Sequence, residues 1–279
     1  MEFQLKNVKI YYEVLGEGKP VVMVHGYFSD HQLMAGCMEP VFQERSGYKR
    51  IYIDLPGMGK SGSADWINSS DRMLDVLAAL IRKVVPHENF LLAGESYGGY
   101  LSRGILYRMR ERVDGLLLIC PVVVPLSRNR DTPPHIVLVR DDQLLGGLSP
   151  EAAKYFDSAA VVQSPSVYER YAAEVVSGLK LADSPFLKHI KNSAYGFSFD
   201  VDEKEKAAFS KPVLFLTGRQ DACVGYRDAW GILEHYPRAT FAVLDLAGHN
   251  LQIEQAVLFN TLVKDWLTRT ENFPHENGG

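Results

Sequence analysis

The chain has 279 residues and a mass of 31.3 kDa, and 46% of its residues are hydrophobic and 23% are charged. A chain of this length can bury about 73% of its unfolded surface, so its core needs no disulfide or metal to be stable. Thirty Lys and Arg residues against 34 Asp and Glu residues give a net charge of −4. This charge argues against a nucleic-acid-binding protein.

The sequence contains no segment with the composition of a membrane span. Its longest uncharged stretch, Gly115 to Ser127, has 13 residues and two prolines, whereas crossing a bilayer takes about 20 apolar residues. The N-terminus lacks the basic and apolar regions of a secretory signal, so we expect a cytoplasmic protein. Cys37, Cys120 and Cys223 are too few and too scattered for a disulfide framework or a thiolate metal site.

Strand patterns come first in chain order. The alternation of Phe3 to Tyr12 runs into Gly16-Glu17-Gly18 and predicts an antiparallel hairpin at the edge of a sheet. Later apolar runs are continuous, which is typical of strands buried on both faces. These runs are Val21–Val24, Arg50–Ile53, Phe90–Ala93, Val113–Ile119, Val213–Leu216 and Thr240–Leu246.

Helical patterns separate most of these strands. Apolar residues at helical spacing predict helices over Met73–Val84, Leu101–Met109 and Leu258–Trp266, and Ser69 precedes the first of them as a capping residue. Alternating strands and helices predict an α/β fold with a largely parallel sheet covered by helices on both faces.

The alternation stops at residues 122–210. This region lacks a strand candidate and carries helix starts at Ser149-Pro150 and Ser164-Pro165, so it predicts a helical insertion. We therefore assign residues 1–121 and 211–268 to the core. Residues 269–279 are polar and aperiodic, and we expect a disordered tail there.

The segment around Ser96 has the clearest chemical signal. The strand from Phe90 runs through Gly94-Glu95-Ser96-Tyr97-Gly98 into a predicted helix. In this context Gly-x-Ser-x-Gly predicts a nucleophile elbow, a strained turn that exposes the serine hydroxyl above the sheet. We therefore predict that Ser96 is a nucleophile.

A serine nucleophile needs a base, and the base needs a carboxylate. His249 follows the last predicted strand and Asp221 the one before it, so we predict His249 as the base and Asp221 as the acid. Two rival acids are less well placed. Asp245 lies within the last predicted strand, only four residues before His249, and Glu95 is expected to point away from the bend.

An oxyanion hole requires backbone N–H donors near the nucleophile. Tyr97 directly follows Ser96, and Tyr27 lies in the loop after the first parallel strand, so we predict their N–H groups as the donors. His25, in the same loop, is expected to shape the loop through hydrogen bonds rather than to act as a second base.

Together these motifs resemble the α/β-hydrolase superfamily. The resemblance rests on Val21–Gly26, Asp54–Ser61, the Ser96 elbow, the Gly218–Asp221 turn and the Gly248-His249 pair. It implies an eight-stranded, mostly parallel sheet, a Ser-Asp-His triad, a helical cap after the sixth strand and no cofactor. More narrowly, the chain resembles the serine-nucleophile, cap-bearing esterases and proline-iminopeptidase-like enzymes.

Two other motifs do not predict a functional site. Gly59-Lys60-Ser61 is similar to part of a phosphate-binding loop, but that motif needs glycine where this chain has Asp54. Cys223 has no histidine of its own in motif spacing, so it is not predicted as a nucleophile. We predict no metal site.

A serine at the elbow favours acyl transfer to water, since the relatives that open epoxides or cleave carbon–halogen bonds carry aspartate there. Carboxylic esters are the expected substrates. Three alternatives stay open on the same triad: a lactonase, a carbon–carbon bond hydrolase, or a proline-iminopeptidase-like peptidase that binds a free amine through Glu169 or Glu174 of the cap. A small-molecule receptor with little turnover is the alternative from another class.

Aromatic residues are frequent in the predicted cap. Most should pack in the core, and we expect about two to four to line an apolar pocket above Ser96 that takes a small or medium apolar acyl group. The candidates are Tyr155, Phe156, Tyr168, Tyr171, Phe186, Tyr195, Phe197, Phe199 and Phe209. The sequence carries no legible signal of oligomeric state.

Overall fold

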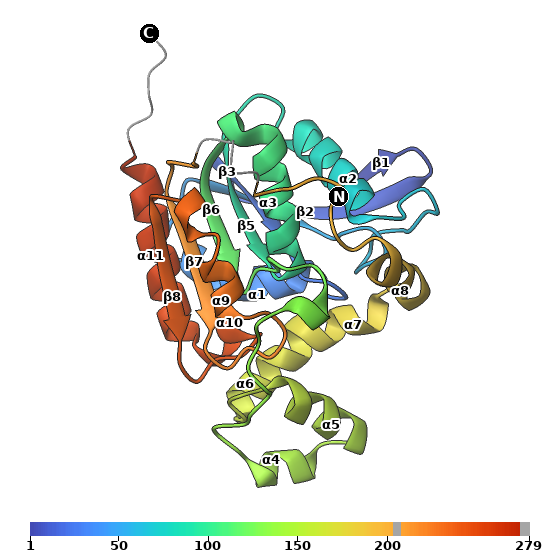
Figure 1. Ribbon diagram of the computed structural model, residues 1–279, viewed down its shortest axis with the longest axis vertical. Coiled ribbons are helices and arrows are strands. Elements are labelled where there is room, and N and C mark those ends of the chain that lie inside the picture. The colour runs from blue at the N-terminus through green and yellow to red at the C-terminus, as the bar shows by residue number, and fades with distance from the viewer. Residues whose placement is uncertain (203–207, 274–279) are drawn as a thin grey trace.

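The computed structural model describes residues 1–202 and 208–273 and is built around an eight-stranded sheet (Figure 1). The strand order is β1-β2-β4-β3-β5-β6-β7-β8. From β4 to β8 all neighbours run parallel, whereas β1 pairs antiparallel with β2 and β2 antiparallel with β4. The α/β fold with a mostly parallel sheet is therefore confirmed. The strands are β1 (Glu2–Leu5), β2 (Val8–Leu15), β3 (Lys19–Val24), β4 (Tyr48–Ile53), β5 (Phe90–Glu95), β6 (Val113–Ile119), β7 (Val213–Gly218) and β8 (Ala239–Leu244).

The edge hairpin forms, but its turn lies elsewhere than the glycines suggest. The chain reverses between β1 and β2, where Lys6 has a φ of 50°. Gly16 and Gly18, also at positive φ, instead lie in the connection from β2 to β3. The glycines are needed there because a Cβ on Gly18 would lie 2.2 Å from the Gly47 carbonyl oxygen.

Helices cover both faces of the sheet. The helices of the core are α1 (His31–Phe42), α2 (Ser70–Val84), α3 (Tyr97–Met109), α9 (Tyr226–Trp230), α10 (Leu251–Glu254) and α11 (Ala256–Glu271). The predicted helices correspond to α2, α3 and α11, and the Ser69 side chain caps α2 by accepting the Arg72 N–H. The sequence patterns did not predict α1, α9 and α10.

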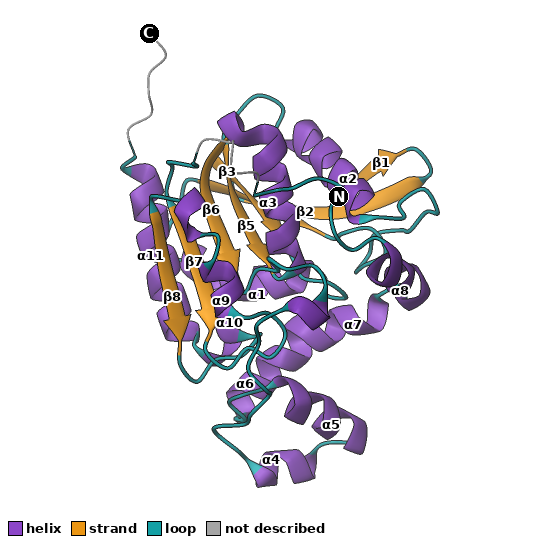
Figure 2. Ribbon diagram, viewed as in Figure 1, coloured by secondary structure: helices purple, strands orange, loops and turns teal. Residues whose placement is uncertain are grey.

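Two glycines show which helix covers which face. A Cβ on Gly94 of β5 would lie 2.5 Å from the Ser102 hydroxyl of α3, and one on Gly115 of β6 would lie 2.6 Å from Thr270 of α11. Gly94 pairs with Leu118 of β6, so these two residues face the same side of the sheet. Gly115 lies three residues before Leu118, and because successive residues of a strand alternate in side, Gly115 faces the opposite side. Figure 2 shows α2 and α3 on the near side.

In the connection between β6 and β7, the helical segment 142–181 extends beyond the carboxyl ends of the strands (Figure 1). The helices of the whole 122–210 region are α4 (Asp142–Gly147), α5 (Pro150–Ala159), α6 (Pro165–Tyr171), α7 (Ser177–Leu181) and α8 (Ser184–Ser193). A π-helical turn, Ala172–Val176, joins α6 to α7. Ser149 and Ser164 cap α5 and α6 as their sequence predicts. In the described part of this region, extended pairing is limited to one bridge between Val139 and Val162.

The last helix continues past the predicted start of the tail at residue 269. It extends to Glu271 because its final turn has tertiary partners. Thr270 is buried, and Glu271 accepts hydrogen bonds from Arg45 and Tyr48. The rest of the predicted tail, 274–279, lies outside the described residues. Within residues 1–202 and 208–273, no helix is long and apolar enough to cross a membrane.

Candidate active site

Ser96 lies in a strained turn where β5 ends and α3 begins. Its φ of 52° and ψ of −113° are unusual for a residue with a side chain. The turn needs glycine on both sides, because a Cβ would lie 2.4 Å from the Gly98 carbonyl oxygen at Gly94 and 2.1 Å from the Val24 carbonyl oxygen at Gly98. The sequence thus forms the predicted elbow.

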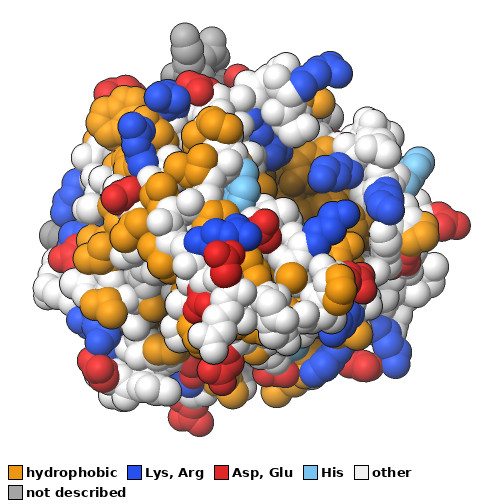
Figure 3. Space-filling view, turned by 90° about the horizontal axis from the view of Figure 1, so that it is seen from below, with side chains coloured by type: hydrophobic (Ala, Val, Ile, Leu, Met, Phe, Trp, Pro, Cys, Tyr) orange, Lys and Arg blue, Asp and Glu red, His pale blue; other side chains and the backbone are white. Residues whose placement is uncertain are grey.

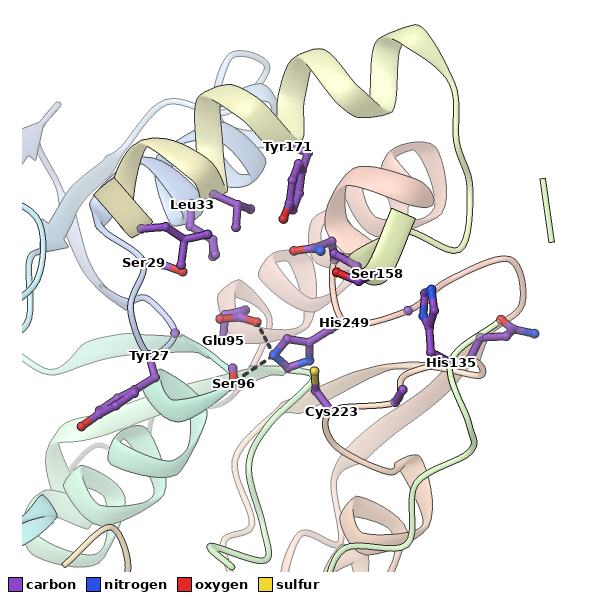
Figure 4. A pocket seen from close by; sticks show the side chains of 18 residues that line it. Tyr27, Ser29, Leu33, Glu95, Ser96, His135, Ser158, Tyr171, Cys223 and His249 are labelled. Carbon is purple, nitrogen blue, oxygen red and sulfur yellow. Dashed lines mark hydrogen bonds and ion pairs between the residues drawn. The ribbon is translucent and has the colours of Figure 1, made fainter. Parts of the chain in front are cut away.

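His249 lies between Ser96 and Asp221, both of which are within hydrogen-bond distance of its ring, and Figure 4 shows the ring beside Ser96. Its Nε2 is 3.0 Å from the Ser96 Oγ, and its Nδ1 is 2.8 Å from the Asp221 Oδ2. Asp221 is fully buried, and its other carboxylate oxygen accepts the backbone N–H groups of Cys223 and Val224. These bonds fix the carboxylate, which in turn orients the imidazole.

The environment of His249 favours the charged imidazolium. Burial lowers the pKa of His249, but the charge and hydrogen bond of Asp221 together with the Cys223 and Cys120 thiols outweigh burial, so the pKa lies well above its ordinary value. A base with a raised pKa holds a proton more strongly once it has taken one from the serine hydroxyl.

The two predicted oxyanion donors lie beside Ser96. Tyr97 is the first residue of α3, so its N–H has no acceptor within the helix. Tyr27 lies on the cavity wall while its side chain points away from the cavity (Figure 4) and donates a hydrogen bond to the Leu187 carbonyl oxygen. Their role as donors stays a prediction.

His25 has the structural environment that we predict for it. Its Nε2 accepts the Leu55 N–H at 3.0 Å, and its Nδ1 lies 2.7 Å from the Gly26 carbonyl oxygen. Both ring nitrogens are thus used within the loop, and burial lowers the pKa of His25.

Glu95 does not point away from the bend, so that prediction is wrong. Its side chain is buried, lines the same cavity as Ser96, and places Oε1 3.4 Å from the His249 Nε2 (Figure 4). Burial raises the pKa of Glu95 to about 7, the Asp221 charge adds to this rise, and His249 opposes it. An acidic residue in a strand that is otherwise buried and apolar is the sequence signal that could have identified it.

Glu254 is a second residue that sequence reasoning missed. Its Oε1 accepts the backbone N–H groups of Val161 at 2.6 Å and Val162 at 3.2 Å, and its Oε2 accepts that of Gly248 at 2.6 Å. The carboxylate therefore ties the 122–210 region to the residue that precedes His249. Its place in α10, a short helix with no clear pattern, gave no signal.

The cavity above Ser96 is small, about 220 Å³. Leu33, Tyr171, Val175 and Leu179 form an apolar wall, whereas Glu95, Ser158, His135 and Gln220 are polar. Of the nine aromatic residues proposed for this role, Tyr171 lines the cavity, so the expected number of two to four is too high. Others pack elsewhere: Tyr195 stacks on Tyr97 and Phe197 on Tyr100.

A groove of about 490 Å³ adjoins this cavity on the outside of α5 to α7. It shares Tyr171 and Leu179 with the cavity, and Tyr155 and Tyr168 also line it. Figure 3, seen from below, shows hydrophobic side chains on that side of the molecule between charged ones of both signs. The groove is therefore a mixed surface next to the site.

Neither of the predicted cap acids lines the cavity. Glu169 is exposed, and Glu174 forms a two-bond ion pair with Arg170 at 2.6 and 3.0 Å. The rival acid Asp245 is also exposed and accepts a hydrogen bond from Gln220. These positions leave Asp221 as the acid in contact with the His249 Nδ1.

Cys120, Asp221 and His249 are the residues at this site that could hold a metal, with ligand atoms within 4.8 Å of one another. The Asp221–His249 bond already uses two of those atoms in the arrangement of a triad. Burial raises the pKa of the Cys120 thiol beyond the range in which a thiolate forms readily, which disfavours metal binding.

Comparison with known proteins places these residues in one family. A family model described as alpha/beta hydrolase fold matches residues 19–256, a range that includes Ser96, Asp221 and His249. The crystal structure of an alpha/beta superfamily hydrolase from Oenococcus oeni PSU-1 is similar, with a TM-score of 0.87 and 28% identity over 98% of this chain and 100% of that chain. A pimeloyl-[acyl-carrier protein] methyl ester esterase of Shewanella woodyi is 24% identical over 93% of this chain and 98% of its own length. A 2-hydroxymuconate semialdehyde hydrolase of Pseudomonas putida is 24% identical over 92% of this chain and 89% of its own length.

Proposed function

The chain belongs to the α/β-hydrolase family, and we propose that it cleaves a small carboxylic ester through an acyl-enzyme on Ser96. The observation that carries this proposal is the His249 ring, with Nε2 3.0 Å from the Ser96 Oγ and Nδ1 2.8 Å from the Asp221 carboxylate. Such an arrangement activates a hydroxyl group for attack on a carbonyl carbon.

The reaction has two halves. His249 takes the proton of Ser96 as the hydroxyl attacks the ester carbonyl, and then gives it to the leaving alcohol. The N–H groups of Tyr97 and Tyr27 stabilise the oxyanion in between. Water then attacks the acyl-enzyme with His249 again as the base, which releases the acid and restores Ser96.

The size of the cavity supports a small acyl group. Its volume of about 220 Å³ lies below the usual range of about 300–1,000 Å³ for ligand pockets. Residues 122–210 act as a cap in this proposal, because Tyr171, Val175 and Leu179 form the wall that faces Ser96.

The lining of the cavity supports an ester without an anionic group, whereas the names of the relatives cover more than one kind of substrate. The Shewanella woodyi relative is named as a methyl ester esterase. The Pseudomonas putida relative is named for a muconate semialdehyde, which carries a carboxylate. The residues described as lining the cavity here include no Lys or Arg to pair with such a group.

Turnover of p-nitrophenyl esters with acyl chains from acetyl to octanoyl tests the proposal. We expect turnover to be highest with short chains and to vanish in Ser96→Ala. Ser193→Ala, which removes an exposed hydroxyl of α8, serves as the matched control and should behave as the wild type. A folded wild type that turns over none of these esters would favour the receptor alternative.

A further inference from the structure

Glu95 is a buried carboxyl group that the proposed triad does not use. Its side chain is only 3% exposed and lies on the cavity wall, with Oε1 3.4 Å from the His249 Nε2. In Figure 4 it points into the cavity from the same side as Ser96. A substrate positioned for attack by Ser96 therefore lies next to this carboxyl group.

Glu95 has no cationic partner when His249 is neutral, which is the form of His249 that attack by Ser96 requires. When the Nδ1–H of His249 donates to Asp221, its Nε2 has a lone pair that accepts the Ser96 hydroxyl. An ionised Glu95 then faces a neutral ring. The Gly26 N–H is then its hydrogen-bond donor, and a buried carboxylate that lacks a cation is costly, so a cation that enters the cavity beside it is stabilised.

Apart from the two histidines, His135 and His249, no residue described as lining the cavity can carry a positive charge. Asp221 is completely buried behind His249. The residues described as lining the cavity include neither Lys nor Arg, and Glu95 is the one acidic side chain among them. The site therefore attracts a cationic substrate group and repels an anionic one.

We propose that Glu95 determines substrate specificity by binding an ammonium group that the substrate carries on the carbon next to its scissile carbonyl. This inference rests on the hydrolase function proposed above and narrows it. Ser96 Oγ and Glu95 Oε1 lie 3.0 and 3.4 Å from the same nitrogen of His249. Only a group close to the reacting carbonyl can therefore reach Glu95, so the substrate class is an α-amino acyl ester or amide.

The test uses three p-nitrophenyl esters of matched size. L-Alanine, isobutyrate and methylmalonate esters share a methyl-bearing carbon next to the carbonyl and differ by an ammonium, a methyl or a carboxylate group on it. Values of kcat/KM are measured for the wild type, for Glu95→Gln and for Glu169→Gln, with spontaneous hydrolysis subtracted. The assay is run at a pH between the Glu95 pKa of about 7 and the α-amino pKa of about 7.7–8.0, where most of Glu95 is ionised and most of the amine is protonated.

We expect the wild type to prefer the alanine ester over the isobutyrate ester. This ratio should fall at least about tenfold in Glu95→Gln, the lower end of what a hydrogen bond to a charged group contributes. The ratio of isobutyrate to methylmalonate should fall in the same variant. Glu169→Gln, which changes an exposed acid, should keep both wild-type ratios.

Two results would overturn the inference. The first is an equal change for all three esters in Glu95→Gln, because Glu95 would then act on His249 and not on the substrate. The second is a wild-type preference for isobutyrate over alanine, which needs no variant to fold. If the wild type is active, either result leaves the proposed hydrolase function unaffected. A wild type that is inactive on every ester refutes both proposals.

Discussion

Replacing Glu254 by glutamine should lower both the stability and the turnover of this enzyme. The native carboxylate receives Val161 and Val162 N–H groups on one oxygen and the Gly248 N–H on the other. Glutamine has the same shape but only one oxygen. Its amide nitrogen must therefore face a backbone N–H on one side, and at least one buried donor loses its acceptor.

The expected loss of folding free energy follows from these hydrogen bonds. A hydrogen bond to a charged group contributes about 1.5–3 kcal/mol. Because burial raises the pKa of Glu254, removal of the charge recovers part of its desolvation cost. We therefore expect the free energy of unfolding to fall by about 2 kcal/mol, in the lower half of that range. Loss of the Gly248 contact also loosens the residue before His249, and a displacement of about 1 Å costs about 100-fold in rate.

Urea unfolding and ester kinetics measure the two effects on the same protein. In Glu254→Gln we expect a lower midpoint with an unchanged slope, and a kcat that falls more than KM changes. Glu234→Gln, an exposed acid, is the control and should stay within about 0.5 kcal/mol of the wild type. A Glu254→Gln variant with wild-type stability and kcat would refute this reasoning.

Three further changes test other parts of the site. Asp221→Asn should lower kcat by about 10⁴-fold with little effect on KM, because the amide no longer fixes the tautomer of the base; steady-state kinetics that show a loss below tenfold would contradict the assignment. His249 must be neutral to accept a proton, and its pKa is raised above 6.5. The kcat/KM of an uncharged ester should therefore rise with pH above 6.5. A profile that is flat from pH 6 to 9 would count against His249 as the base. Gly98→Ala should unfold or greatly destabilise the protein, since its Cβ would lie 2.1 Å from the Val24 carbonyl oxygen. Gly146→Ala is the control, because the space around its Cβ is open, and it should leave the melting temperature unchanged or higher. Equal melting temperatures for the two variants would argue against the elbow geometry.

The elements that sequence analysis predicts well are those with a local physical cause. Continuous apolar runs give the parallel strands because both faces of the sheet are covered, and Ser69, Ser149 and Ser164 cap the helices that they precede. The elbow can be predicted for the same reason, since contacts within and next to the turn require its two glycines.

What the sequence does not predict depends on contacts between distant segments. The direction of Glu95 follows from the twist of the elbow and from Gly26, whose Cβ would lie 2.1 Å from the Glu95 carboxylate. The end of α11 depends on Arg45 and Tyr48, more than 200 residues earlier in the chain. Which cap aromatic faces the cavity depends on how the α6–α7 segment packs over Ser96, and helical spacing alone does not distinguish Tyr171 from Tyr168.

The most direct test of the central claim is to identify the residue that a fluorophosphonate modifies. The wild type is treated with the probe, digested and analysed by mass spectrometry, and His249→Ala is treated in parallel. We predict a single adduct on Ser96 in the wild type and much slower labelling in His249→Ala, because the hydroxyl then lacks its base. An adduct on another residue, or labelling of Ser96 at the same rate without His249, would contradict the proposed triad.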